Sequence, residues 1–138
     1  MFNKPISLQL KHFNVQELYL TKIKDELNQN ENGFSLGVAI GILDEIDDLQ
    51  NAQHFAVTFK SEFQIKEGFI LKVEYQSIFE TDTPIDEEVK KSKFLTVNAP
   101  AIAFPFFRAF IATFLTNSGF EPIILPSINF MKLSEQNG

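Results

Sequence analysis

The chain has 138 residues, of which 44% are hydrophobic and 22% charged, a composition that predicts one globular domain covering residues 1–138. Its formal net charge of -6 repels phosphates and anionic lipid heads, so we expect no nucleic-acid binding. The most apolar stretch, residues 99–115, contains Arg108, Pro100 and Pro105, so we expect no stable membrane insertion. Because the sequence has no cysteine, it forms no disulfide and no cysteine-ligated metal site. The unusual feature is its sixteen Phe, with two Tyr and no Trp.

The first predicted element is a long strand over residues 6–20. Apolar residues alternate with polar ones there, but the apolar residues switch from even to odd numbers between Leu10 and Phe13 and back to even numbers between Val15 and Leu18. Because strand side chains alternate between the two faces of a sheet, two parity changes predict two bulges or bends.

A second strand is predicted after a connecting loop. Residues 21–33 are polar and rich in turn formers, which predicts the loop. Residues 34–42 then alternate bulky apolar side chains with Ser, Gly and Ala. This pattern predicts a strand with one bulky face and one nearly bare face.

The third and fourth strands are predicted to form a hairpin of defined register. Odd-numbered positions are apolar over most of residues 55–65 and 69–79. Antiparallel partners on the apolar face therefore both have odd residue numbers, so the residue numbers of any two partners add up to an even number. A three-residue loop, with Gly68 in the left-handed conformation, satisfies this condition. The residue numbers of each pair of partners then add up to 134. The sheet then has one apolar and one solvated face. Two charge pairs support this register: Lys60 opposite Glu74, and Glu62 opposite Lys72.

The last third of the chain is predicted to be helical. Residues 81–92 are charged and form either a loop or a short solvated helix. Beyond them, apolar side chains recur at helical spacing, which predicts a helix with Pro105 in its first turn and Gly119 at its end. We expect a final segment that is extended to Pro126 and closes with a short helix capped by Ser127.

This long helix is apolar around most of its circumference, more than one sheet face can cover. We therefore expect it to contact another subunit. The predicted oligomer-interface residues are Phe107, Phe110, Ile111 and Phe114. The elements together predict an α+β fold: a four-stranded antiparallel sheet, a long helix and a short final helix.

Catalytic or metal-binding patterns are not found in the sequence. His12 and His54 have no second His or Cys at ligand spacing, and the acidic clusters do not match a calcium loop. There is no nucleophile elbow and no phosphate loop. We expect no enzyme activity, no catalytic residue, no metal and no cofactor. The first thirteen residues lack the apolar centre of a signal peptide, so we expect a cytoplasmic protein.

The C-terminal third resembles the SecB family of protein-export chaperones. Residues 98–119, NAPAIAFPFFRAFIATFLTNSG, contain a Pro, an aliphatic run into Phe-Pro-aromatic, an Arg shortly after it and a Gly at the helix end. Residues 120–133, FEPIILPSINFMKL, continue with a Pro, an aliphatic run, a second Pro and an Asn-Phe pair. The upstream order of strands is similar too.

The resemblance implies a homotetramer, built as a dimer of dimers through the long helix. It also implies an ATP-independent holdase that wraps unfolded polypeptides or preproteins along apolar grooves and passes them to the translocation motor SecA. Combined with the bulky face of residues 34–42, it implies client contacts at Phe34, Leu36, Val38, Phe130 and Leu133.

The sequence departs from the family pattern in two ways. Lys72 stands where the SecA-facing sheet commonly has an acid, and no extended acidic tail follows Leu133. We therefore predict that contact with SecA is weak and salt-sensitive. Two other interpretations stay open: a SecB-like chaperone dedicated to another client, such as an antitoxin, and a protein that binds a small apolar ligand in a pocket.

Overall fold

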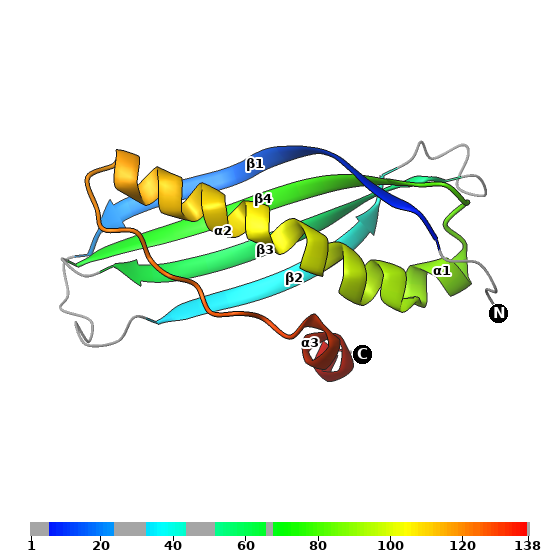
Figure 1. The fold of residues 1–138 in the computed structure, drawn as a ribbon. Helices are drawn as coiled ribbons and strands as arrows, with labels where there is room; N and C mark the ends of the chain where they lie inside the picture. Colours follow the sequence, from blue (N-terminus) through cyan, green and yellow to red (C-terminus); the bar gives the residue numbers. More distant parts are fainter. Residues whose placement is uncertain (1–5, 24–32, 44–51, 66–67, 138) are drawn as a thin grey trace.

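A computed structural model of the chain describes residues 6–23, 33–43, 52–65 and 68–137. Within these ranges four antiparallel strands form one sheet in the order β1-β4-β3-β2, followed by helices (Figure 1). The predicted α+β fold is therefore confirmed. The strands are β1 (Leu8–Lys22), β2 (Phe34–Ile42), β3 (His54–Ile65) and β4 (Phe69–Thr81).

The two irregularities predicted for the first strand, as bulges or bends, are present as register shifts. The register between β1 and β4 shifts between Leu10 and His12, and again between Val15 and Glu17. These are the places where the apolar parity of the sequence changes. The strand therefore keeps its Leu, Val and Phe side chains on the inner face of the sheet despite the interruptions. Most of the loop predicted after β1 lies outside the described residues.

The predicted register of β3 and β4 is also confirmed. Ile65 lies opposite Phe69, and Gly68 has a φ of 80°, the left-handed conformation that glycine adopts without strain. Lys60 Nζ lies 3.3 Å from the Oε1 of Glu74. The other two residues of the predicted turn, 66 and 67, lie outside the described residues.

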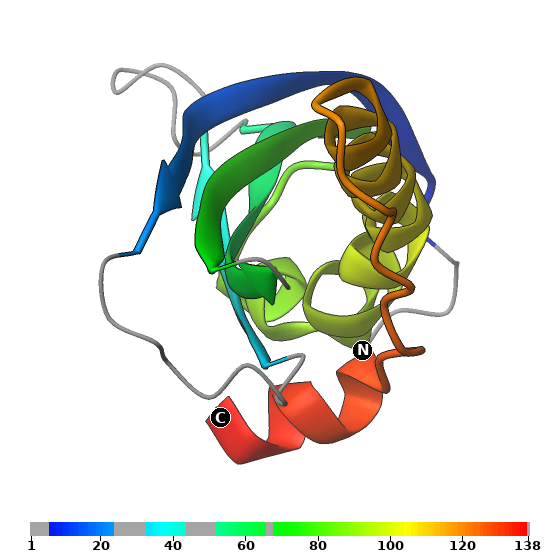
Figure 2. The same cartoon turned by 90° about the vertical axis from the view of Figure 1, so that its left-hand side faces the viewer.

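The inner face of the sheet holds the core. Phe55, Phe59 and Phe63 of β3 are fully buried there, together with Phe79 of β4. Figure 2 shows the sheet curving around the helix α2 (Ala99–Asn117), which lies on its concave side. The outer face is largely solvated, as predicted, although Ala56 and Ile78 on that face are buried.

The long helix begins six residues earlier than the sequence predicted. One π-helical turn, η2 (Phe94–Asn98), leads directly into α2, so Pro105 lies inside the helix rather than in its first turn. A proline removes the hydrogen bond to the carbonyl four residues earlier, here that of Ala101, which is solvent-exposed. Ala99 and Ala103 are fully buried, and this packing holds the turns before the proline.

The end of α2 forms as predicted. The N–H of Phe120 donates to the carbonyl of Leu115 at 2.9 Å, and that of Gly119 donates to Thr116 at 3.2 Å. With Gly119 at a φ of 90°, these two bonds form a Schellman motif.

The start of the final helix was predicted wrongly. Helix α3 (Phe130–Asn137) is capped by Asn129, whose Oδ1 accepts from the N–H of Lys132 at 3.1 Å, and not by Ser127. Residues 120–129 run as an extended segment between α2 and α3, and α3 lies beside β2 (Figures 1 and 2).

The charged segment after β4 forms a short helix, α1 (Glu87–Lys91), one of the two alternatives predicted. The Oδ1 of Asp86 accepts from the N–H of Val89 at 2.8 Å and caps it. Glu87 lies in the first turn and Lys90 in the last, which complements the helix dipole. Val89, 1% exposed, joins α1 to the core.

The helical stretch Phe94–Asn117 is long and apolar enough to cross a bilayer. Length and composition alone are weak evidence for a membrane span, because the core helix of a globular domain has the same properties. In this fold the stretch packs on the sheet through Phe107, Ile111 and Leu115, and Arg108 lies at its middle.

Candidate functional site

The bulky face of β2 is only partly covered by the rest of the chain. Among the described residues β2 ends the sheet and has one neighbouring strand, β3. The even-numbered residues of β2 are half-buried and face the interior, whereas the small odd-numbered residues are exposed. This alternation confirms the strand predicted from the sequence, and it places a row of apolar side chains at the margin of the core: Phe34, Leu36, Val38, Ile40 and Ile42.

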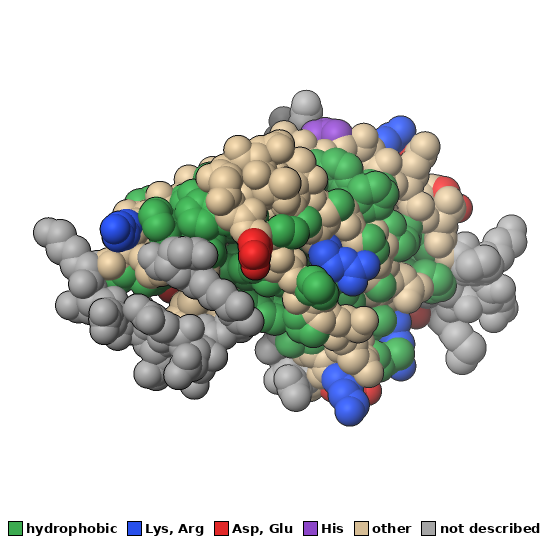
Figure 3. Space-filling model, turned by 60° about the vertical axis from the view of Figure 1, so that its left-hand side comes forward, with side chains coloured by type: hydrophobic (Ala, Val, Ile, Leu, Met, Phe, Trp, Pro, Cys, Tyr) green, Lys and Arg blue, Asp and Glu red, His purple; other side chains and the backbone are tan. Residues whose placement is uncertain are grey.

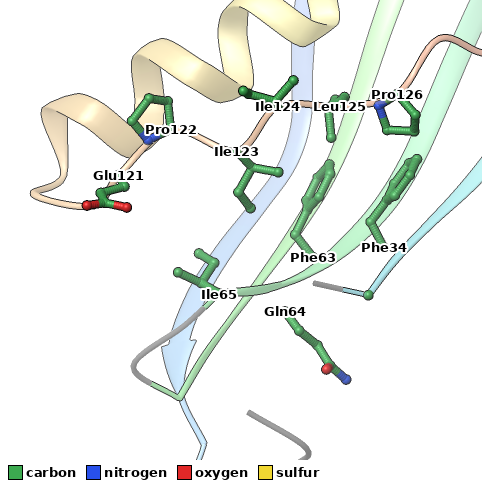
Figure 4. A pocket seen from close by; sticks show the side chains of 11 residues that line it. Phe34, Phe63, Gln64, Ile65, Glu121, Pro122, Ile123, Ile124, Leu125 and Pro126 are labelled. Atoms are coloured by element: carbon green, nitrogen blue, oxygen red, sulfur yellow. The ribbon is translucent and has the colours of Figure 1, made fainter. Parts of the chain in front are cut away.

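One hollow of about 480 Å³ lies at the start of β2, between β3 and the extended segment after α2. The rings of Phe34 and Phe63 stack across the two strands with centroids 5.7 Å apart. Figure 4 shows Ile123 and Leu125 lying over these strands, with Ile124 directed away from them. Leu125 is 3% exposed and Ile124 93% exposed, so alternate side chains of this segment form one wall of the hollow.

A second hollow, of about 640 Å³, lies along the other half of β2. It is lined by Val38 and Ile40 of β2 and by Leu133 of α3. Phe130, 6% exposed, anchors α3 by packing its ring 5.6 Å from Phe104 and 6.2 Å from Phe59. We call the two hollows, with the face of β2 that joins them, the β2 groove.

The structure gathers the predicted client-contact residues along this groove. Phe34 lines the first hollow, Val38, Phe130 and Leu133 line the second, and Leu36 lies between them on the same face of β2. Ile40, Ile123 and Leu125 are among the apolar lining residues that sequence reasoning missed. The parity of β2 could have identified Ile40, whereas the position of the extended segment has no local signal.

The groove offers apolar contacts, and charged groups lie at its margins. Its charged lining residues are Glu121 in the first hollow and Glu87, Lys90 and Lys91 in the second. Among the described residues, no group of three or more His, Asp or Glu side chains is arranged to hold a metal ion. A surface of this kind binds apolar side chains without requiring one particular sequence.

Two of the predicted oligomer-interface residues lie in the core of the single chain. Phe107 and Ile111 are fully buried against the sheet, so a partner chain cannot reach them. Phe110 and Phe114 are half-buried, with their rings 6.3 Å apart. Helical spacing placed these four apolar residues on one stripe of the helix, but it could not show which side of the helix faces the sheet.

Other apolar side chains of α2 and β1 are exposed. Ile102 is 42% exposed and Phe106 48% exposed on α2, and the ring of Phe106 lies 5.0 Å from that of Phe13 on β1. Val15 and Leu18, at the free edge of β1, are 44% and 36% exposed. Figure 3 shows apolar side chains spread over one face of the molecule, with separate charged groups between them.

Two solved structures have a fold similar to that of this chain. The SecB-like chaperone Rv1957 of Mycobacterium tuberculosis, in complex with a ChAD peptide from the HigA1 antitoxin, matches with a TM-score of 0.59 and 12% identity, covering 88% of this chain and 87% of that one. A protein of unknown function from Streptococcus agalactiae matches with a TM-score of 0.58 and 8% identity, covering 91% of this chain and 100% of that one. The fold is therefore that of the SecB-like α+β proteins.

The chain belongs to the SecB family. The family model for preprotein translocase subunit SecB matches residues 7–138. The protein-export protein SecB of Wolbachia sp. (strain wRi) is 30% identical over 132 residues, covering 92% of this chain and 70% of that protein. The SecB of Neorickettsia sennetsu is 32% identical over 94 residues, covering 62% of this chain. That match spans 56% of the Neorickettsia protein, and a match to the SecB of Roseobacter denitrificans spans 51% of its length.

Proposed function

We propose that the protein is an ATP-independent holdase that binds unfolded polypeptides or preproteins in the β2 groove and serves protein export from the cytoplasm. The observation that carries this proposal is the pair of apolar hollows along one edge strand of a SecB-family fold. Apolar surface in a groove binds the apolar segments that an unfolded chain exposes. The net charge of -6 favours the solubility of the loaded assembly.

The test is suppression of the aggregation of a urea-diluted client, without nucleotide. Leu133→Ser removes a groove side chain, whereas Met131→Ser, on the same helix, removes one that is 37% exposed and does not line the groove. We expect the unmodified protein and Met131→Ser to suppress aggregation and Leu133→Ser to lose at least half of that activity. No suppression by the unmodified protein at stoichiometric tetramer would refute the holdase proposal.

A dedicated client is a second candidate function. The outer face of the sheet carries Lys72 and Lys60 among its acids, which weakens attraction to the basic tail of SecA that the family resemblance implies. The SecB-like chaperone of M. tuberculosis was solved with an antitoxin peptide. If the present protein serves such a client, a toxin–antitoxin pair should lie beside its gene, and co-expression should protect that antitoxin from degradation.

We also propose that the protein is a homotetramer, built as a dimer of dimers. The support is the exposed apolar side chains of α2 and β1, above all Ile102, Phe106 and Val15. Phe110 and Phe114, half-buried beside them, can contribute at the margin. Burial of such side chains against a second copy removes apolar area from water, which favours association.

A further inference from the structure

The outer face of the sheet carries four charged side chains in a square. In the register of β3 and β4, Lys60 lies opposite Glu74. Two residues further along the strands, Glu62 lies opposite Lys72. The Nζ of Lys60 lies 3.3 Å from the Oε1 of Glu74, and Glu62 and Lys72 are exposed. Opposite charges are therefore neighbours both across the strands and along them. We call these four residues the charge square.

The two flanks of the charge square differ in height. On the β1 side lie Glu17 and Tyr19, two large exposed side chains. On the β2 side lie Ser35 and Gly37, which are small and also exposed. The large side chains of β2 point to the inner face, so they do not cover this flank. A hollow of about 270 Å³ lies over the charge square and is lined by Ser35 on this side. The outer face is therefore high along β1 and low along β2.

The charge square is complementary to a copy of itself. Two copies can face each other about a two-fold axis that runs along the strands, between β3 and β4. This rotation places β4 of one copy over β3 of the other. Glu74 then faces Lys60 of the second copy, and in the same way Lys72 faces Glu62. Each contact occurs twice, so charges of opposite sign meet across the whole square, which favours this orientation over others.

The same rotation also matches the two flanks, because it places β1 of one copy over β2 of the other. The large Tyr19 then faces the small Ser35, and Glu17 faces Gly37. Sheets that pack face to face keep their strands roughly aligned, as this axis requires. Figure 2 shows the sheet curving around α2, so its outer face is convex and two copies touch over a limited area. Contacts of limited area are weak and reversible.

We propose that a second copy of this chain docks on the outer face of the sheet through the charge square, in a weak and reversible contact. The contact is separate from the exposed apolar side chains that support the proposed tetramer, so it joins assemblies to one another. Isolated surface charge pairs contribute little to association, whereas several charges in a network contribute more. The net charge of -6 repels copies of the chain. The contact therefore depends on how the charges are arranged and not on their sum.

The test uses variants that rearrange the charge square but keep the composition and the net charge. The β3 variant carries Lys60→Glu and Glu62→Lys, and the β4 variant carries Lys72→Glu and Glu74→Lys. In each variant alone, like charges face each other across the two copies. In an equimolar mixture of the two variants, opposite charges face each other again. Sedimentation equilibrium from micromolar to millimolar concentration measures the mass of each sample.

We expect the mass of the unmodified protein to rise with concentration above the mass of its assembly in dilute solution. The β3 variant and the β4 variant alone should associate about tenfold more weakly or less, and their mixture should recover the association. A cross-strand variant with Lys60→Glu and Glu74→Lys should associate as the unmodified protein does, because opposite charges still meet about the proposed axis.

A change of shape tests the same contact without moving a charge. Among the described residues, a Cβ at Gly37 meets no atom closer than 3.8 Å, so the fold accepts a side chain there. Gly37→Trp fills the low flank and should abolish the association, whereas the matched control Gly37→Ala should keep it. Circular dichroism checks that each variant is folded.

The proposal is overturned if the mass of the unmodified protein does not rise with concentration. It is also overturned if the folded β3 and β4 variants do not recover the association when mixed. Association that persists equally in both variants and in Gly37→Trp assigns the contact to another surface. If the unmodified protein keeps one mass and binds the basic tail peptide of SecA, the outer face serves that partner and not a second copy.

Discussion

Replacing Ile102 by Asp should dissociate the proposed tetramer without unfolding the chain. Full burial of an Ile side chain contributes roughly 1.5 to 3 kcal/mol. Ile102 is 42% exposed on α2, so burial of its exposed part against a partner contributes about 1 kcal/mol to association. An unpaired carboxylate in the same contact costs roughly 3 kcal/mol more. The sum, about 4 kcal/mol per copy, raises the dissociation constant roughly a thousandfold.

The assay is native mass spectrometry or light scattering at micromolar concentration. Ile124→Asp is the matched control, since Ile124 is 93% exposed and lies on the extended segment rather than on α2. We expect the control to keep the mass of the unmodified assembly and Ile102→Asp to give smaller species with an unchanged circular dichroism spectrum. An Ile102→Asp protein that keeps the full assembly mass would show that this side of α2 is not an interface.

Three further outcomes are expected. Gly119→Ala should lower the free energy of unfolding by about 1 kcal/mol and the melting temperature by about 4 °C, because alanine is strained at a φ of 90°; an unchanged melting temperature would contradict this. Burial raises the pKa of Tyr75 above its ordinary 10.0, so as pH rises Tyr75 loses its proton in the unfolded chain before it does so in the folded chain. The free energy of unfolding should therefore fall as pH rises above about 10, and it should fall less in Tyr75→Phe. Binding to the basic tail peptide of SecA should be weak and salt-sensitive and should strengthen in Lys72→Glu, as calorimetry at low and high salt would show; tight, salt-insensitive binding by the unmodified protein would refute the assigned docking face.

The sheet was the part of the fold most accessible from the sequence. Parity and turn length together fix an antiparallel register, so the pairing of Ile65 with Phe69 followed from the positions of apolar residues and from Gly68. The bulges of β1 followed from the same rule, because a change of apolar parity must coincide with an extra residue if one face is to stay buried.

The helices were less accessible, because their ends depend on tertiary contacts. Proline favours the first turn of a helix, but burial of Ala99 and Ala103 extends α2 past Pro105 toward the N-terminus. Ser127 and Asn129 are both good caps, and only the position of Phe130 in the core selects Asn129.

The candidate site was partly predictable for the same reasons. The alternation of β2 identifies which of its side chains face inward, but not that the strand lies at an edge. The wall formed by Ile123 and Leu125 depends on where the extended segment crosses the sheet. Phe107 and Ile111 share their apolar character with the exposed Phe106, so only the packed structure separates core from surface.

The central claim, that unfolded chains bind in the β2 groove, is tested most directly by site-specific cross-linking. The chain has no cysteine, so Ser134→Cys, which lines the groove, and Glu17→Cys, which lies on the outer face of the sheet, each provide one attachment point for a photo-cross-linker. On illumination with an unfolded client, the groove claim predicts client adducts from position 134 and few from position 17. Equal labelling, or labelling mainly from position 17, would contradict it.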